Sequence, residues 1–125
     1  MSDAREGSDE PARRAAARRV LDLLGLAARA GGILTGIDSV RRAAREDGVY
    51  RVILAEDAAP GQQGKLTPLL EARQVPFHTL FTRDELGGAT GRSPVSAIGI
   101  TDRNFARRTG ELVGTLTEGR FTAQP

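Results

Sequence analysis

Several side chains in this sequence are of types that do chemistry in enzymes, but their spacing favours no catalytic site. Glu56 and Asp57 are neighbours after an apolar stretch, and adjacent residues of an extended chain point to opposite faces, so they do not readily share a metal ion. His78 is the only histidine, the chain has no cysteine, and a lone strand histidine is usually structural. No G-x-S-x-G motif surrounds the serines considered as nucleophiles, Ser39, Ser93 and Ser96. We therefore expect no catalytic residue, metal or cofactor.

The glycine-broken segment 31–36 is a second candidate for chemistry, because glycine-rich turns can cradle phosphates. It lacks the spacing and the lysine of a P-loop, and it follows a predicted helix where a G-x-G-x-x-G motif follows a strand. A nucleotide site of either kind is therefore disfavoured. The segment does deliver a helix N-terminus at Gly36, whose free N–H groups and positive dipole end suit phosphate. Glycine there also lets another backbone approach closely.

The short helix predicted after Gly36 carries groups that could hold an RNA backbone. Asp38 can accept hydrogen bonds from a base edge, and Arg42 and Arg45 follow one and two turns later near the same face. Two interpretations stay open at this point. The helix is either an RNA-binding face or a solvated face with an Asp38–Arg42 pair, which contributes roughly a few tenths of a kcal/mol.

The charge distribution is more informative than the net charge of +2. Residues 13–45 hold eight arginines against two aspartates, a local charge of +6. Planar, permanently charged guanidinium groups suit phosphate and stacking contacts. The alternative is a solvated helix face in an arginine-rich protein.

A glycine-rich loop, residues 86–95, is the second segment that could contact a nucleic acid. It supplies small and apolar residues with one arginine, Arg92. RNA recognition commonly targets unstacked bases, against which such a loop could pack. The alternative is an ordinary connection between two elements.

Helices that alternate with short apolar strands must position these segments. We predict helices over residues 13–29, about 36–47, within 62–73, 82–88 and 102–113, and strands over 33–35, 51–55, 75–81 and 95–101. Capping-box spacings start two of these helices, at Thr35–Asp38 and Thr82–Glu85, and Pro68 suggests that the third begins only near Thr67. The alternation predicts an α/β fold, a three-layer α/β/α sandwich with a small mixed central sheet, whose strand order stays open.

The length of 125 residues fits one domain, which we place at residues 13–114 between a disordered tail, 1–12, and a C-terminal tail, 115–125. The polar, acidic N-terminus has no apolar core of a signal sequence, and no stretch of about 18 apolar residues occurs. We expect a soluble, cytoplasmic protein that has no membrane contact and is a monomer.

Several stretches together resemble one family. They are Gly25–Gly31, Thr35–Gly36, Val52–Asp57, Val75–Pro76, Glu85–Gly91 and Ala97–Asp102. Over residues 18–113, in order and spacing, the chain is similar to the kink-turn-binding ribosomal proteins of the L7Ae type, particularly their small bacterial YlxQ-like members. The resemblance implies an α/β/α sandwich that binds a sharply kinked RNA, associated with ribosomes or transcripts, without catalysis.

The resemblance also implies roles for particular residues. In the family, the start of the second helix meets tandem sheared G·A pairs, and the loop before the last strand meets bulged nucleotides. The residues that we predict to bind RNA are Gly31, Gly32, Gly36, Asp38, Ser39, Arg42, Arg45, Glu56, Arg92, Ser93, Pro94, Val95 and Ser96. The chain departs from the family where Asp38–Ser39 replaces an Asn–Glu pair, where Gly32 replaces a lysine, and where Arg42 keeps the charge of a lysine.

Two other function classes stay open. The same scaffold could serve as a protein-interaction module, with Phe105 and Val113 on the last helix as contacts. It could also be the recognition part of an RNA-modifying enzyme. Such an enzyme also needs a catalytic domain, for which we expect no room before Pro125. RNA binding is the function we expect.

Overall fold

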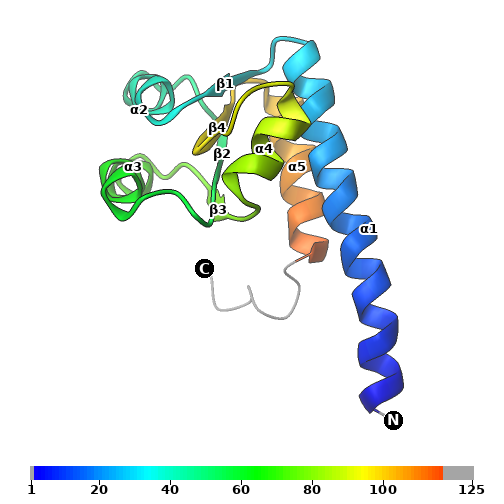
Figure 1. The fold of residues 1–125 in the computed structure, drawn as a ribbon. Coiled ribbons are helices and arrows are strands. Elements are labelled where there is room, and N and C mark those ends of the chain that lie inside the picture. The colour runs from blue at the N-terminus through cyan, green and yellow to red at the C-terminus, as the bar shows by residue number, and fades with distance from the viewer. Residues whose placement is uncertain (1, 117–125) are drawn as a thin grey trace.

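The computed structural model describes residues 2–116 and shows an α/β sandwich of three layers. Two helices cover one face of a four-stranded sheet, α2 (Ile37–Arg45) and α3 (Pro60–Ala72). Three helices cover the other face, α1 (Ser2–Arg29), α4 (Arg83–Thr90) and α5 (Arg103–Leu116), as Figure 1 shows. The predicted fold class is confirmed. Among the described residues, no helix is long and apolar enough to cross a membrane.

The sheet has the strand order β1-β4-β2-β3 and is mixed, as predicted. Its strands are β1 (Ile33–Thr35), β2 (Arg51–Leu54), β3 (Phe77–Thr79) and β4 (Ala97–Ile100). The last strand lies between the first two and runs antiparallel to both, whereas β3 pairs parallel to β2 at the edge. Because β4 is central, the loop that precedes it lies beside the loop that follows β1.

The two middle strands form an aliphatic core with the inward faces of the helices. All four residues of β4 and three of β2 are buried, which fits strands covered on both faces. Glycine at position 99 is a packing requirement, since a Cβ there would lie 3.0 Å from Val49 and 3.2 Å from Val40. Val113 is fully buried and Phe105 packs against the core, so the two apolar contacts expected for a protein-interaction surface belong to the interior.

The first helix begins earlier than predicted. It starts at Ser2 instead of Arg13, and Pro11 lies within it, so residues 2–12 are helical where we expected a disordered tail. Alanine, arginine and glutamate at positions 4, 5, 6, 10 and 12 favour the helix, whereas Gly7 and Pro11 within the same segment do not. The predicted C-terminal tail falls mostly outside the described residues, and α5 continues to Leu116.

Two other helices and two strands have boundaries that differ from the sequence prediction. Helix α3 starts at Pro60, because proline is favourable in the first turn of a helix. The helix continues past Pro68, which has no N–H to donate to the Gly64 carbonyl; Gly64 is exposed, so water can donate to that carbonyl instead. Helix α4 continues through the Gly87–Gly88 pair that we expected to end it, and it ends at Gly91 in a left-handed conformation. The strands β3 and β4 are shorter than their predicted apolar runs.

Candidate nucleic-acid interface

A cleft of about 620 Å³ lies at the beginning of α2. It brings together two segments some sixty positions apart in the sequence, the β1–α2 junction and the loop of residues 91–96. The lining residues are Thr35, Gly36, Ile37, Ala59, Gln62, Arg83, Arg92, Ser93, Pro94, Val95 and Ser96. Six of the thirteen predicted RNA-binding residues therefore line one cleft: Gly36, Arg92, Ser93, Pro94, Val95 and Ser96.

Gly36 determines how α2 enters the cleft. Its backbone has φ 100° and ψ 146°, a conformation that residues with a Cβ rarely adopt, and its N–H donates to the Ala97 carbonyl at 2.9 Å. Gly36 is the N-cap, and no side chain caps the helix, so the capping box predicted from Thr35 and Asp38 is absent. Thr35 is held in β1, where it pairs with Ile98. The first N–H groups of α2 thus lack a side-chain acceptor and suit an anionic ligand.

The loop of residues 91–96 is held rigidly on α4. Arg92 N–H donates to the Gly87 carbonyl at 2.8 Å, and a Cβ at position 87 would overlap the carbonyl of Ser93. Val95 N–H donates to the Arg83 carbonyl at 3.1 Å, and the Val95 side chain is 6% exposed. The loop therefore presents Arg92, Ser93 and Pro94, which are exposed, whereas Val95 anchors it to the core.

Besides Thr35 and Ile37, the two neighbours of Gly36, three residues of the cleft were not predicted from the sequence. Ala59 and Gln62 belong to the start of α3, whose N-cap Ala59 makes no side-chain cap. The proline at the first helical position, Pro60, was the signal that could have located this N-terminus. Arg83 is the third, and its guanidinium lies 3.6 Å from Asp57. Two helix N-termini without side-chain caps and two arginines, Arg83 and Arg92, therefore surround one cleft, which suits an anionic ligand.

The polar residues on the outer face of α2 are exposed beside the cleft. Asp38, Ser39, Arg42 and Arg45 are all exposed, and within residues 2–116 no ion pair joins Asp38 to Arg42. The Asp38–Arg42 pair of the alternative interpretation is therefore not formed, whereas the exposure of this face agrees with both interpretations. Arg42 and Arg45 both belong to the last turn of this short helix, and Arg42 is the nearer of the two to its N-terminus. Arg41 is a structural residue, because its Nε donates to the Lys65 carbonyl on α3 at 3.0 Å.

Gly31 and Gly32 lie at the opposite end of β1 from Gly36, a separation of about 10 Å along the strand. Gly31 has φ 76° after the end of α1. A Cβ on Gly32 would be 3.3 Å from Asp102, so this glycine allows the close approach of α5. The structure gives both glycines a role in the backbone and does not bring them to the cleft.

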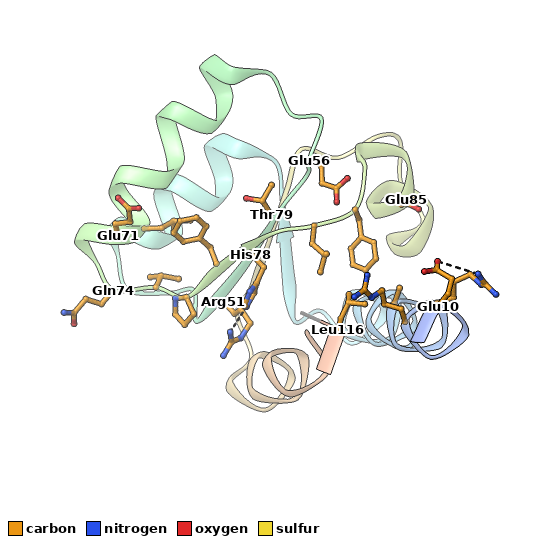
Figure 2. Close-up of a pocket in the computed structure, with 18 residues that line it drawn as sticks. Glu10, Arg51, Glu56, Glu71, Gln74, His78, Thr79, Glu85 and Leu116 are labelled. Carbon is orange, nitrogen blue, oxygen red and sulfur yellow. Dashed lines mark hydrogen bonds and ion pairs between the residues drawn. The ribbon is translucent and has the colours of Figure 1, made fainter. Parts of the chain in front are cut away.

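Glu56 also lies outside the cleft and lines a larger groove of about 1160 Å³ along β3. Figure 2 shows this groove with Glu56 near one end and Arg51 and His78 at its centre. Arg51 donates from Nε to the Ala106 carbonyl at 2.8 Å and from Nη1 to His78 Nε2 at 2.9 Å. Burial, and next the charge of Arg51, lower the pKa of His78 to about 4, so the imidazole is neutral near pH 7 and can accept this hydrogen bond. The contacts support the structural role predicted for His78.

Asp57 links the turn after β2 to α4. Its Oδ1 accepts from the Arg83 N–H at 2.8 Å, so it contributes to the cap of a helix distant in sequence. Glu56 and Asp57 are adjacent in sequence, and a shared metal ion was disfavoured for them. In the structure Glu56 lines the β3 groove while Asp57 caps α4. Among the side chains that the structure describes, those of residues 10–116, there is no group of three or more potential metal ligands.

Comparisons with known proteins agree with this architecture. The model of the ribosomal protein L7Ae/L30e/S12e/Gadd45 family matches residues 18–109. The RNA-binding protein YlxQ of Enterococcus faecium is 31% identical over 96 residues, which are 77% of this chain and 92% of that protein. The RNA-binding protein YlxQ of Bacillus subtilis (strain 168) is 33% identical over 86 residues, covering 69% of this chain and 86% of the relative.

Two solved structures have the same fold. A protein of unknown function from Bacillus halodurans C superimposes with a TM-score of 0.73 and 37% identity, covering 75% of this chain and 95% of the other. The 15.5kD RNA binding protein of Giardia lamblia gives a TM-score of 0.69 and covers 81% of this chain and 87% of its own. Its identity of 23% makes it a comparison of folds alone.

Proposed function

The chain belongs to the ribosomal protein L7Ae/L30e/S12e/Gadd45 family, and we propose that it is a non-catalytic RNA-binding protein that recognises a kink-turn or a similarly folded RNA. The two YlxQ relatives are named as RNA-binding proteins, which supports this function. The observation that carries the proposal is the cleft, where the uncapped N-terminus of α2 and the rigid loop 91–96 lie together.

The cleft and the exposed face of α2 beside it have different chemical tasks in the proposed complex. The first N–H groups of α2, with Arg42 one turn later, bind phosphates of the kinked strand. Asp38 and Ser39 reach base edges at the same end of the helix, where hydrogen bonds can distinguish bases. On the loop, Arg92 adds a phosphate contact and Pro94 offers an apolar surface to an unstacked base.

The protein acts in this proposal by population shift. A kinked RNA exchanges with extended forms, and a protein that binds only the kinked form increases its share. One cytoplasmic, monomeric chain bound to a ribosomal RNA or a transcript is sufficient for this activity. Phosphate contacts make the affinity dependent on salt, whereas base contacts give the preference for one RNA over another.

A titration with two RNA hairpins tests the function. One hairpin contains a standard kink-turn, and the other has its sheared G·A pairs replaced, each measured at two salt concentrations. We expect binding of the first to be about ten-fold or more tighter, since base-edge contacts distinguish RNAs of equal charge. Equal, strongly salt-dependent binding to both would contradict kink-turn recognition, and absence of binding to either would contradict RNA binding.

Two single variants then locate the interface. Arg92→Ala should weaken binding to the kink-turn by about ten-fold, because one phosphate contact is lost from the cleft. Arg108→Ala removes the same charge from an exposed position on α5 that lies outside the cleft, and it should leave the affinity within about two-fold. Equal losses in both variants would argue for attraction to overall charge instead of a defined site.

A further inference from the structure

A row of three arginines follows one flank of α1, outside the cleft. Arg14, Arg18 and Arg29 are exposed, and together with Gly25 they occupy positions 14, 18, 25 and 29 of the helix. At 100° per residue these four positions fall within an arc of about 60°, and they extend over about 22 Å of helix. The row is therefore a linear array of positive charge along one side of the longest helix in the structure, the blue helix of Figure 1.

The packing of α1 on α4 shows which way this flank faces. A Cβ at Gly25 would lie 2.7 Å from the Ala89 carbonyl oxygen, so the row's own glycine is the point where the last turn of α4 touches α1. Arg29 follows one turn later, and its Nη1 is 3.8 Å from the same Cβ position. Arg92 comes three residues after Ala89, in the loop that follows α4, and lines the cleft. The α1 row thus begins beside the loop that forms the cleft and leads away from it.

The charges of the row are not used within the described part of the chain. Arg18 and Arg29 form no ion pair among residues 10–116, whose side chains the structure describes, although Asp22 lies one turn after Arg18. Arg14 has one contact, to Glu10 at 3.6 Å, with both side chains at least 60% exposed, and an exposed pair of this kind is readily exchanged for a phosphate. Ligand binding therefore does not require the loss of a buried interaction.

We infer that the α1 row binds the phosphate backbone of a double-helical RNA stem next to the element held in the cleft. A linear array of about 22 Å exceeds a single carboxylate or phosphate and matches a polyanion, since a duplex carries a charge roughly every 1.7 Å of its axis. Arginine binds phosphate through its forked N–H groups and keeps its charge at any physiological pH. This inference rests on the proposed function, because the cleft fixes the RNA from which the stem extends.

The test uses two RNAs that share one kink-turn and differ in the length of a flanking stem, about five or about fifteen base pairs, since phosphate contacts need duplex to bind. The full chain is compared with the triple variant Arg14→Ala, Arg18→Ala, Arg29→Ala. A matched variant removes three exposed arginines from other positions, Arg13→Ala, Arg19→Ala, Arg108→Ala. All six substitutions place alanine in a helix, which favours folding, and circular dichroism verifies the helix content.

We expect the row variant to bind the long-stem RNA about ten-fold or more weakly, and its slope of log affinity against log salt to fall by about two to three. Its affinity for the short-stem RNA should stay within about three-fold, as should both affinities of the matched variant. Equal losses in the two triple variants, or no loss in the row variant, would overturn the inference while the preference for the kink-turn stands. Failure of the unmodified protein to bind either RNA would overturn both proposals.

Discussion

The N-termini of α2 and α4 lie beside the same cleft, yet side chains cap the backbone N–H groups of α4 and not those of α2. At α4 the Glu85 N–H donates to Thr82 Oγ1 at 3.1 Å, the Thr82 N–H donates to Glu85 Oε1 at 2.9 Å, and Asp57 accepts from the Arg83 N–H. At α2 the N-cap is Gly36, and no side chain caps the helix. One N-terminus is satisfied within the protein, and the other is left for a ligand.

The difference separates groups that stabilise the fold from groups that are available for binding. A side-chain cap contributes about 1 kcal/mol to stability, and a helix that lacks one forgoes that contribution. Here the uncapped end lies in a cleft with Arg92, and the glycine that begins it cannot be replaced without strain. We therefore expect substitutions at the start of α2 to change RNA binding, and removal of the side-chain cap of α4 to change stability alone.

Replacing Gly36 by alanine should have the largest effect on the cleft. At φ 100° a Cβ is strained although open space surrounds it, so Gly36→Ala should cost about 1–3 kcal/mol of stability and turn the first N–H groups of α2 away from the cleft. Affinity for a kink-turn RNA should fall by at least about ten-fold. Urea unfolding and RNA titration measure the two effects separately.

Gly64→Ala is the matched control for this change. Gly64 is exposed within α3, a Cβ there meets no atom within 4 Å, and its φ is compatible with alanine. The control should raise stability by about 0.5–1 kcal/mol and leave RNA binding unchanged. If Gly36→Ala destabilises the protein but binds RNA with full affinity, the N-terminus of α2 is not part of the interface.

Removing the cap of α4 should have the reverse profile. Thr82→Ala takes away the acceptor for the Glu85 N–H and should cost about 1 kcal/mol, with RNA affinity unchanged because the cleft keeps its N–H groups. Thr115→Ala is the control, since that exposed hydroxyl contacts only the Glu111 carbonyl and its loss should cost less than about 0.5 kcal/mol. Weaker RNA binding by Thr82→Ala at unchanged stability would contradict the division between the two helices.

The sequence could not distinguish these two helix starts. Thr35 with Asp38 and Thr82 with Glu85 have the same spacing, and both predicted a capping box. Only the second forms, because Thr35 is committed to β1, where it pairs with Ile98, and the helix begins one residue later. Tertiary strand pairing therefore decides which of two equal local signals is used.

The layers and most elements follow from hydrophobic periodicity, because burial on one helix face or on both sheet faces leaves a local pattern. The assembly of the cleft does not follow from it. Gly36 meets loop 91–96 only because β4 is inserted between β1 and β2, an order that no local pattern encodes. Likewise, Gly87 was expected to end a helix, whereas it continues α4 and gives room to the carbonyl of Ser93. Glycine signals both breaks and close approaches, and the sequence alone does not tell them apart.

The pH dependence of stability is a smaller effect, and it arises from His78, which lies outside the cleft. The pKa of His78 is lowered from 6.5 to about 4, so the unfolded chain binds a proton more readily than the folded one between these values. Stability should therefore decrease as pH falls from about 6.5 to about 4, with a modest amplitude because the ring is only partly buried. His78→Gln should remove this dependence in urea unfolding, and NMR of the single histidine should report the lowered pKa. An NMR pKa near 6.5 would contradict the Arg51–His78 contact.

Replacing Asp38 by asparagine should have the smallest effect, and it should raise RNA affinity while it lowers stability. The Asp38 carboxylate, when ionised, only accepts hydrogen bonds and repels phosphate, whereas an asparagine amide also donates. Asp38→Asn should therefore raise affinity for a kink-turn RNA by about two- to five-fold, through lower charge repulsion and an added donor. It should also lower stability by about 0.3–1 kcal/mol, because an acidic residue in the first turn interacts favourably with the helix dipole. A change of both quantities in the same direction would mean that the contact of Asp38 with a base edge depends on the carboxylate as an acceptor and that the amide does not replace it.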